Sequence, residues 1–280
     1  MGKLLQGKYS IITGGSQGIG KAIARAFLEE GCGCLLVSRT PDTLEDTVQE
    51  ISAIGPRVLA FRGDVGSAVD VRAMTECALA EFGTIDVLVN CAGVYGPIGP
   101  STEVSSQEWW DTLRVNLFGA FLCTQAVLPD MLRKGSGKVI NLAGGGASGP
   151  FPRFSAYAAS KAAVVRLTET MAEELKGTGI DINAIAPGPV NTRLLDQVLA
   201  AGKAAGDFLA RSLKQKTEGG TPPERAAELA VFLASSLSDG LSGRFISAVW
   251  DDWQEMSGRI PEIMASELYT LRRVTDSVSG

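Results

Sequence analysis

The chain contains no histidine among its 280 residues. Without an imidazole it has no His-dependent catalytic triad, no histidine metal ligand and no imidazole general base. Cysteine is also scarce, and an odd number in apolar settings is typical of core residues in a reducing compartment rather than of a disulfide framework. The five cysteines are Cys32, Cys34, Cys77, Cys91 and Cys123. We therefore expect no metal site.

The chain also lacks basic clusters and long hydrophobic runs. Its net charge is −5 and its pI is near 5.0, which argues against a nucleic-acid surface. The opening segment MGKLLQGKYSIITGG lacks the long apolar core of a signal peptide, and Gln6 stands where a myristoylation site has Ser or Thr. No uncharged apolar run is long enough to span a bilayer. These absences predict a soluble cytoplasmic protein with no nucleic-acid or membrane partner.

What the chain does have is a regular alternation of short β-rich runs and helical segments. Strands are predicted at 9–13, 34–38, 57–64, 85–90, 138–142, 181–185 and 245–249. Helices are predicted at 19–30, 41–54, 68–82, 107–133, 155–176 and 223–235. Apolar strands that alternate with helices form a parallel sheet covered on both faces. The sequence therefore predicts an α/β fold, a single Rossmann-like domain with a doubly wound sheet of about seven strands.

Two regions interrupt this alternation. We expect a body over 1–253, including a variable substrate loop at 194–220, and a C-terminal helical tail at 254–280. Thr221 is expected to cap the helix that opens at Pro223, and Pro261 is expected to open a helix in the tail. Residues 275–280 are expected to fray. The apolar stripe predicted for the tail helix consists of Ile260, Ile263, Met264, Leu268 and Leu271.

A glycine-rich run, Thr13-Gly-Gly-Ser-Gln-Gly-Ile-Gly20, follows the first strand and leads into a helix. Glycines let the backbone approach a pyrophosphate closely, and a helix N-terminus offers free N–H groups and the positive end of a dipole. A turn that binds no ligand would have the same composition. The position between the first strand and the first helix favours the nucleotide-binding interpretation.

Tyr157 and Lys161 bound the run YAASK in a segment with helical periodicity. Four residues apart on a helix, their side chains share one face. An ammonium near a phenol lowers the cost of forming the phenolate, so we expect it to lower the pKa of Tyr157 toward neutrality. A solvated helix face would carry the same pair by chance, so the pattern gains weight only from its companions.

Further motifs follow in order along the chain, and with them it resembles the short-chain dehydrogenase/reductase family over about the first 250 residues. Together they are far more specific than any one alone. The motifs are TGGSQGIG at 13–20, Asp64-Val65, Asn90-Cys-Ala-Gly93, Asn116, YAASK at 157–161 and Pro187-Gly188-Pro-Val-Asn-Thr192.

The resemblance implies where a nicotinamide dinucleotide lies. Asp64 is expected to accept from the adenine amino group while Val65 holds the ring, and Thr192 to bond the carboxamide. Asn90, Ala92 and Gly93 are expected to line the adenosine ribose and the central sheet. The remaining cofactor-binding residues implied are Gly14, Ser16, Gln17, Gly18, Ile19, Gly20, Ser38, Arg39, Thr40, Tyr157, Lys161, Pro187, Gly188 and Val190.

The end of the second strand bears on the choice between NAD and NADP. An acidic residue there would repel a 2′-phosphate, but this chain has Ser38-Arg39-Thr40. The Arg39 guanidinium can pair with the phosphate as a planar fork. The family's second basic position, within the glycine loop, is Gln17 here. The sequence therefore favours NADP(H), but this preference depends on Arg39 alone, and NAD(H) stays possible.

By the same resemblance, Tyr157 is the general acid or base and Lys161 bonds the nicotinamide ribose. Asn116 is expected to hold a water that connects Lys161 to solvent. The family's catalytic serine, thirteen residues before the tyrosine, corresponds to Gly144 in this chain. Loss of one such hydrogen-bond donor costs on the order of 10²–10³ in rate.

Three explanations of Gly144 stay open. Ser148 can supply the hydroxyl, because three glycines make the loop pliable. The substrate or a water can supply it, and glycine makes room for a bulky polyol or sugar. Alternatively, redox activity is impaired. We expect substrate contacts from Gly144, Gly145, Ser148 and Tyr157.

The sequence thus predicts an NAD(P)-dependent oxidoreductase that interconverts a secondary alcohol and a ketone, on a small polar, hydroxylated substrate. The alternative is a non-catalytic nucleotide-binding protein of the same fold. The resemblance implies a homodimer or homotetramer packed through the helices that carry Asn116 and Tyr157. Trp250 and Trp253 are expected either at the substrate mouth or a subunit contact, or as anchors of the tail. Arg193 and Asp196 begin the variable substrate loop.

Overall fold

The alternation of strand and helix produces one parallel sheet. The computed structural model describes residues 2–274. Seven strands pair in the order β3-β2-β1-β4-β5-β6-β7, and each pairing is parallel, which confirms the predicted Rossmann-like sheet. The strands are β1 (Tyr9–Thr13), β2 (Gly33–Ser38), β3 (Val58–Arg62), β4 (Val87–Asn90), β5 (Gly137–Leu142), β6 (Ile180–Ala186) and β7 (Phe245–Ser247).

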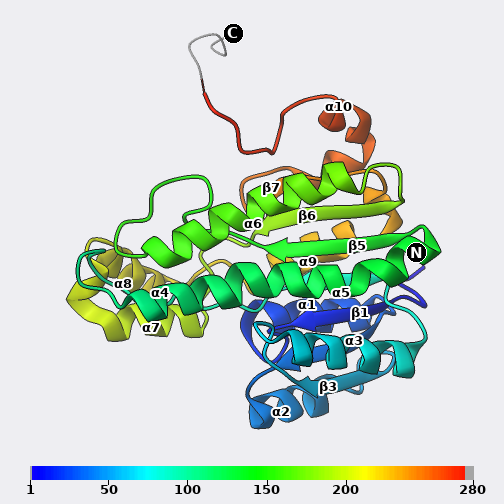
Figure 1. Cartoon of the computed structure of the whole chain (residues 1–280), viewed down its shortest axis with the longest axis horizontal. Helices are drawn as coiled ribbons and strands as arrows, with labels where there is room; N and C mark the ends of the chain where they lie inside the picture. The colour runs from blue at the N-terminus through cyan, green and yellow to red at the C-terminus, as the bar shows by residue number, and fades with distance from the viewer. Residues whose placement is uncertain (1, 275–280) are drawn as a thin grey trace.

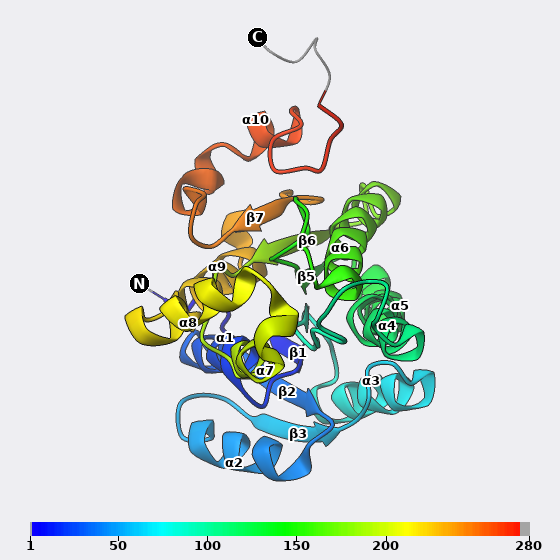
Figure 2. The same ribbon diagram turned by 90° about the vertical axis from the view of Figure 1, so that its left-hand side faces the viewer.

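Helices cover both faces of this sheet (Figures 1 and 2). One face carries α1, α2 and α9, where Phe27 and Leu229 are fully buried. The other carries α3, α4, α5 and α6, where Val127 and Met131 are fully buried. The main helices are α1 (Gly18–Glu29), α2 (Pro41–Ile51), α3 (Ala68–Phe82), α4 (Ser106–Leu113), α5 (Gly119–Lys134), α6 (Ser155–Glu174), α7 (Arg193–Ala201), α8 (Phe208–Glu218), α9 (Pro223–Ala234) and α10 (Ile260–Met264).

The strand order turns at β1 and β4, the two neighbours from which the chain winds in opposite directions. Ligands of open α/β sheets bind outside the carboxyl ends of the strands at such a switch point. Helices α7 and α8, from the predicted variable loop, lie beside this end of the sheet (Figure 2). The fold therefore directs attention to the loops that follow β1, β4, β5 and β6.

The long helix predicted at 107–133 is interrupted. Between α4 and α5 the chain forms a π-helical turn, η1 (Arg114–Phe118), which contains Asn116. A π turn shifts the hydrogen bonding by one residue and is frequent at functional sites. By length and composition alone, the segment Ser106–Lys134 would suffice to cross a membrane, but half of its apolar window is buried inside the fold. A core helix of a globular protein has these properties.

The C-terminal part differs most from the sequence prediction. Strand β7 ends at Ser247, not 249, because the Ser247 hydroxyl accepts from the backbone N–H groups of Val249 and Trp250, both at 3.2 Å, and closes a turn. The predicted Thr221 cap is wrong, because Pro222 occupies the N-cap of α9 and no side chain caps it.

The predicted tail helix is also shorter than its apolar stripe. Helix α10 has five residues and begins next to Pro261, as expected. Leu268 and Leu271 lie beyond it, because the chain leaves the helix to run beside β7. A 3₁₀ turn, η4 (Trp253–Gly258), precedes α10. The frayed end predicted at 275–280 lies outside the described residues.

Candidate active site

A cleft of about 260 Å³ opens at the carboxyl ends of β1, β2 and β4. Its walls come from the glycine-rich loop, the residues after β2 and β3, and the start of α7. Most residues predicted to bind a cofactor line it. These are Gly14, Ser16, Gln17, Gly18, Ile19, Gly20, Ser38, Arg39, Thr40, Asp64, Val65, Ala92, Gly93 and Thr192.

The glycines of this loop are required by close packing. Gly14 has φ +67°, and a Cβ on it would lie 2.9 Å from the Ala92 Cα. A Cβ on Gly20 would lie 2.2 Å from the carbonyl oxygen of Gly14. Gln17, at the N-cap of α1, makes no side-chain cap hydrogen bond, so the first N–H groups of the helix stay available. This cradle fits the pyrophosphate of a dinucleotide.

At the adenosine end, two hydroxyls and Arg39 line the cleft, and Arg114 pairs with Asp64. The Ser16 and Ser38 hydroxyls lie 3.1 Å apart, and Arg39 lines the wall beside them. Partial burial acts to raise the pKa of Asp64, but the bonds from the Gly66 N–H (2.9 Å) and Arg114 (3.2 Å) outweigh it and lower the pKa. Asp64 is therefore a carboxylate, and its oxygens can accept from an adenine amino group.

Two groups of predicted cofactor residues lie elsewhere. Asn90 does not line the cleft, because its amide Nδ2 is directed into the fold and donates to Ala120 O, Thr124 Oγ1 and Asn141 Oδ1. It thereby ties β4 to β5 and α5, which matches the part of the expectation that placed it in the central sheet. Pro187, Gly188 and Val190 line the adjoining cavity, and Thr192 lines both.

The three predicted catalytic side chains meet between these hollows. Lys161 Nζ lies 5.6 Å from the Tyr157 ring centroid and donates to Leu142 O at 2.6 Å, at the end of β5. Asn116 exchanges two 2.9 Å bonds with the Val94 backbone. Its Nδ2 also donates to Ser160 Oγ at 2.9 Å, on the same helix as Tyr157. The π turn thus brings Asn116 against α6.

Burial dominates the titration of this pair. It raises the pKa of Tyr157 well above its usual value, with smaller contributions from Tyr95 and Cys91. It lowers the pKa of Lys161 to about 8. We expected Lys161 to lower the pKa of Tyr157, and this prediction is wrong for the protein without cofactor. The loss of water around the phenol raises its pKa by more than the nearby amine lowers it.

Tyr157 faces a second cavity, of about 590 Å³, that adjoins the cofactor cleft. All four residues predicted to contact substrate line it: Gly144, Gly145, Ser148 and Tyr157. Gly144 has φ +108°, and a Cβ on it would lie 3.3 Å from the Pro187 ring. A serine at this position would be strained in the observed backbone.

An aromatic wall that was not predicted from the sequence lines part of this cavity. The Tyr95 ring lies edge-on to Tyr157, with centroids 4.6 Å apart. Phe151 and Phe208 pack edge-on at 4.7 Å, and both line the cavity. Only one feature of the sequence pointed to Tyr95. It lies two residues after Gly93, the last residue of a motif that was predicted to lie beside the cofactor.

The two tryptophans take different positions. Trp250 is exposed and lines the cavity, whereas Trp253 is buried against Phe232, with ring centroids 5.9 Å apart. Arg193 lines the cofactor cleft, and Asp196 pairs with Lys216 on the surface at 3.0 Å. Of the two alternatives, Trp250 therefore fits the substrate mouth and Trp253 the anchor.

The fold and this site define a dinucleotide-binding α/β oxidoreductase. The family model described as "short chain dehydrogenase" matches residues 8–215. The chain therefore belongs to the short-chain dehydrogenase family, whose members interconvert alcohols and ketones by hydride transfer. This confirms the resemblance seen in the sequence and the predicted reaction.

Named relatives cover most of the chain. A D-threitol dehydrogenase from Mycolicibacterium smegmatis is 36% identical over 239 residues, which are 85% of this chain and 90% of the relative. The structure is similar to NAD⁺-bound xylitol dehydrogenase, with a TM-score of 0.81, 27% identity, and coverage of 87% and 98% of the two chains. It is also similar to a 7α-hydroxysteroid dehydrogenase complexed with NADH and 7-oxo glycochenodeoxycholic acid. That match has a TM-score of 0.78 and 30% identity, and it covers 87% of this chain and 93% of the other.

Proposed function

We propose that this chain is an NADP(H)-preferring dehydrogenase or reductase that interconverts a secondary alcohol and a ketone on a polar, polyol- or sugar-like substrate. The observation that carries the proposal is the position of Tyr157, whose ring lines a 590 Å³ cavity next to the cofactor cleft. The hydroxylated substrate is supported by the relatives named for D-threitol and xylitol. It is also supported by the room that Gly144 leaves in the cavity wall.

The residues present fit the dinucleotide. The Gly14–Gly20 cradle and the α1 N-terminus would hold the pyrophosphate, Asp64 and Val65 the adenine, and Thr192 the carboxamide. When bound, the cofactor supplies or accepts the hydride. Tyr157 donates its phenolic proton to the carbonyl oxygen during reduction and takes it back during oxidation. A buried phenol with a raised pKa holds that proton firmly until charge develops on the substrate oxygen.

Lys161 and Asn116 support this proton transfer. The Lys161 ammonium stabilises negative charge on the phenol oxygen and has a backbone partner, Leu142 O, that fixes its direction. Asn116 Oδ1 accepts one bond, from the Val94 N–H, and an amide oxygen has two lone pairs. One acceptor position is therefore left for the relay water that the resemblance implies.

The NADP(H) preference is supported by Arg39, with the Ser16 and Ser38 hydroxyls beside it. A guanidinium can pair with a 2′-phosphate in two parallel hydrogen bonds. The two related structures are named with NAD⁺ and NADH, so the preference depends on residues of this chain.

We also propose a cytoplasmic homodimer or homotetramer packed through α4, α5 and α6. Three large apolar side chains are exposed along α4, η1 and α5: Trp110 (61%), Phe118 (46%) and Leu132 (48%). A second copy of this face would cover them.

Turnover of a ketone panel by wild type and the Tyr157→Phe variant tests the function. We expect wild type to oxidise NADPH with α-hydroxyketones and ketosugars, and the variant to lose at least about 10²–10⁴-fold in rate, because its general acid is gone. NADPH affinity, followed by fluorescence, should stay unchanged. Tyr9→Phe is the matched control, because Tyr9 stacks on Phe82 at 4.8 Å and lines neither hollow.

The competing function is a nucleotide-binding protein without redox activity, which the missing hydroxyl at Gly144 favours. It predicts NADPH binding in both proteins and turnover in neither. That result across a broad panel would refute the enzyme proposal.

A further inference from the structure

The C-terminal tail returns to the substrate cavity. After α10 it runs beside the last strand, where the Phe245 N–H donates to Tyr269 O at 2.7 Å. Three consecutive residues, Tyr269, Thr270 and Leu271, line the same cavity as Tyr157. We call residues 269–271 the tail wall.

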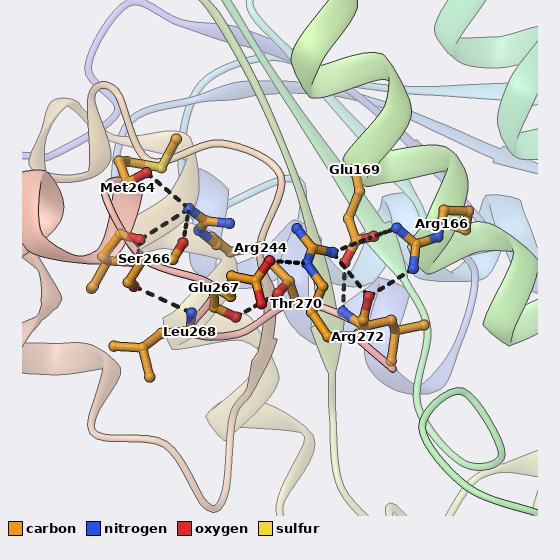
Figure 3. Close-up of polar contacts among 11 residues, drawn as sticks. Arg166, Glu169, Arg244, Met264, Ser266, Glu267, Leu268, Thr270 and Arg272 are labelled. Carbon is orange, nitrogen blue, oxygen red and sulfur yellow. Dashed lines mark hydrogen bonds and ion pairs between the residues drawn. The ribbon is translucent and has the colours of Figure 1, made fainter. Parts of the chain in front are cut away.

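One end of this segment is held by Arg244, which precedes β7 and is 7% exposed (Figure 3). Its Nη2 donates to the carbonyl oxygens of Ile263 at 2.9 Å, Ser266 at 3.2 Å and Met264 at 3.4 Å. A buried guanidinium needs such acceptors to offset the loss of water. Arg244 therefore fixes the backbone just before the tail wall.

The other end is held by Glu169 of α6, which is 8% exposed (Figure 3). Its Oε1 accepts from the Leu271 N–H at 2.7 Å. Its Oε2 lacks hydrogen-bond geometry but forms ion pairs with Arg166 and, at 3.6 Å, with Arg272. Arg166 also donates to Leu271 O at 2.7 Å. We call the contacts of Glu169 and Arg166 with Leu271 a clamp, and those of Arg244 a second one. The first clamp belongs to α6, the helix that carries Tyr157 and Lys161.

The two clamps leave only a short span between them, and that span faces the cavity. Tyr269 has φ +60°, in the left-handed region that a tyrosine rarely adopts. Such a conformation persists where the surroundings impose it. Leu271 packs against the cluster of Ala143 and Val165, beside the Gly144 loop. Arg244 and Glu169 thus hold the chain on both sides of its cavity-lining residues.

We propose that the tail wall limits the size of substrate that the cavity accepts, and that Arg244 and Glu169 hold it in place. Tyr269 is then a specificity-determining residue, and Glu169 is a positioning residue that acts through the backbone of Leu271. The inference rests on the proposed function, because it assigns the cavity to the substrate.

Size selection by Tyr269→Gly tests the wall. Glycine suits φ +60°, so the variant removes the side chain without adding backbone strain. The probes are acetoin, 2-hydroxycyclohexanone and benzoin, α-hydroxyketones of increasing bulk. We expect the ratio of kcat/KM for benzoin to that for acetoin to rise about ten-fold or more, which is the effect of small volume changes in a pocket. Tyr269→Asn, which also tolerates this φ, should act in the same direction.

Leu268→Ala is the control, because Leu268 is 44% exposed in the same tail and does not line the cavity. Its ratio should stay at the wild-type value. An unchanged ratio in both Tyr269 variants, with turnover retained, would overturn the wall and leave the proposed function intact. If wild type turns over none of the three, the broad ketone and ketosugar panel decides the proposed function, and size selection is measured as Kd by calorimetry on the NADP⁺-loaded proteins. An unchanged order of Kd would overturn the wall there too.

The clamp has its own readout, which does not depend on activity. Glu169→Ala removes the acceptor of the Leu271 N–H, so amide exchange at 269–272 should accelerate about ten-fold or more if the clamp holds the wall. Exchange in β1 reports whether the variant stays folded. Unchanged exchange at 269–272 in a folded variant would show that Glu169 does not position the wall.

Discussion

Lys161 Nζ donates a 2.6 Å hydrogen bond to the carbonyl oxygen of Leu142. The bond fixes a buried ammonium at the end of β5, 5.6 Å from the Tyr157 ring centroid. Burial lowers the pKa of this amine to about 8, so the protonated form is less stable in the fold than in water. Lys161, which the proposed reaction needs, therefore lowers the stability of the folded protein.

Lys161→Met should abolish turnover and stabilise the protein at pH 7. Methionine fills a similar volume without a charge, although Leu142 O loses its donor. We expect a net gain of about 1–2 kcal/mol, or several degrees in thermal midpoint at about 2–4 °C per kcal/mol. Calorimetry checks this, with Lys216→Met on the exposed surface as the control. A lower midpoint in the Lys161 variant would show that the hydrogen bond outweighs the burial of charge.

The same amine should make stability depend on pH. Its pKa is about 8 when folded and about 10.5 when unfolded, so between these values the unfolded chain binds more protons. Stability then rises with pH from about 8 to 10.5, by on the order of 3 kcal/mol, and is constant below this window. Urea denaturation at pH 7.5 and pH 10 should show this rise in wild type relative to Lys161→Met. Parallel pH profiles for the two proteins would mean that Lys161 titrates normally.

Arg39→Ala should discriminate between the two cofactors. Arg39 lines the cleft next to Ser38, and a lost charge-assisted pair to the 2′-phosphate costs about 1.5–3 kcal/mol. We expect NADPH affinity to fall roughly ten- to a hundred-fold and NADH affinity to change little. Fluorescence titration measures both. Arg62→Ala is the control, because Arg62 ends the neighbouring strand, is exposed and does not line the cleft. Equal losses for NADPH and NADH would refute the assignment of Arg39.

Regular structure was predictable because its signals are local. The helix at 68–82 and the strand at 9–13 were predicted to the residue, since a period of apolar residues and a capping or turn residue define each. The π turn at Arg114–Phe118 was not predicted, because its extra residue per turn is imposed by packing against α6. The path of the tail depends on the distant residues Arg244 and Glu169, which no local pattern reveals.

The site was predictable where a motif carries its own geometry. The glycine loop lines the cleft as expected, because its turn and the following helix are contiguous in the chain. The predicted direction of the Tyr157 pKa shift was wrong, because the burial of the phenol depends on Tyr95 and on the whole fold around it. Asn90 was placed near the cleft by its motif, but an amide at the end of a central strand finds its partners in the neighbouring strand and helix.

Ser148→Ala should show what replaces the hydroxyl missing at Gly144. The turn closed by the Ala147 N–H on Gly144 O (3.0 Å) places Ser148 in the wall of the cavity that Tyr157 lines. We expect kcat/KM to fall about 10²–10³-fold, the effect of losing one donor to the substrate oxygen, and Ser148→Thr to retain most of the activity. Ser148 is exposed, so folding should not change. Full activity of the alanine variant would instead assign the missing donor to a substrate hydroxyl or a water. In that case butanone, which lacks the neighbouring hydroxyl of acetoin, distinguishes a substrate hydroxyl from a water. The kcat/KM for butanone should be lower than that for acetoin only if the substrate supplies the donor.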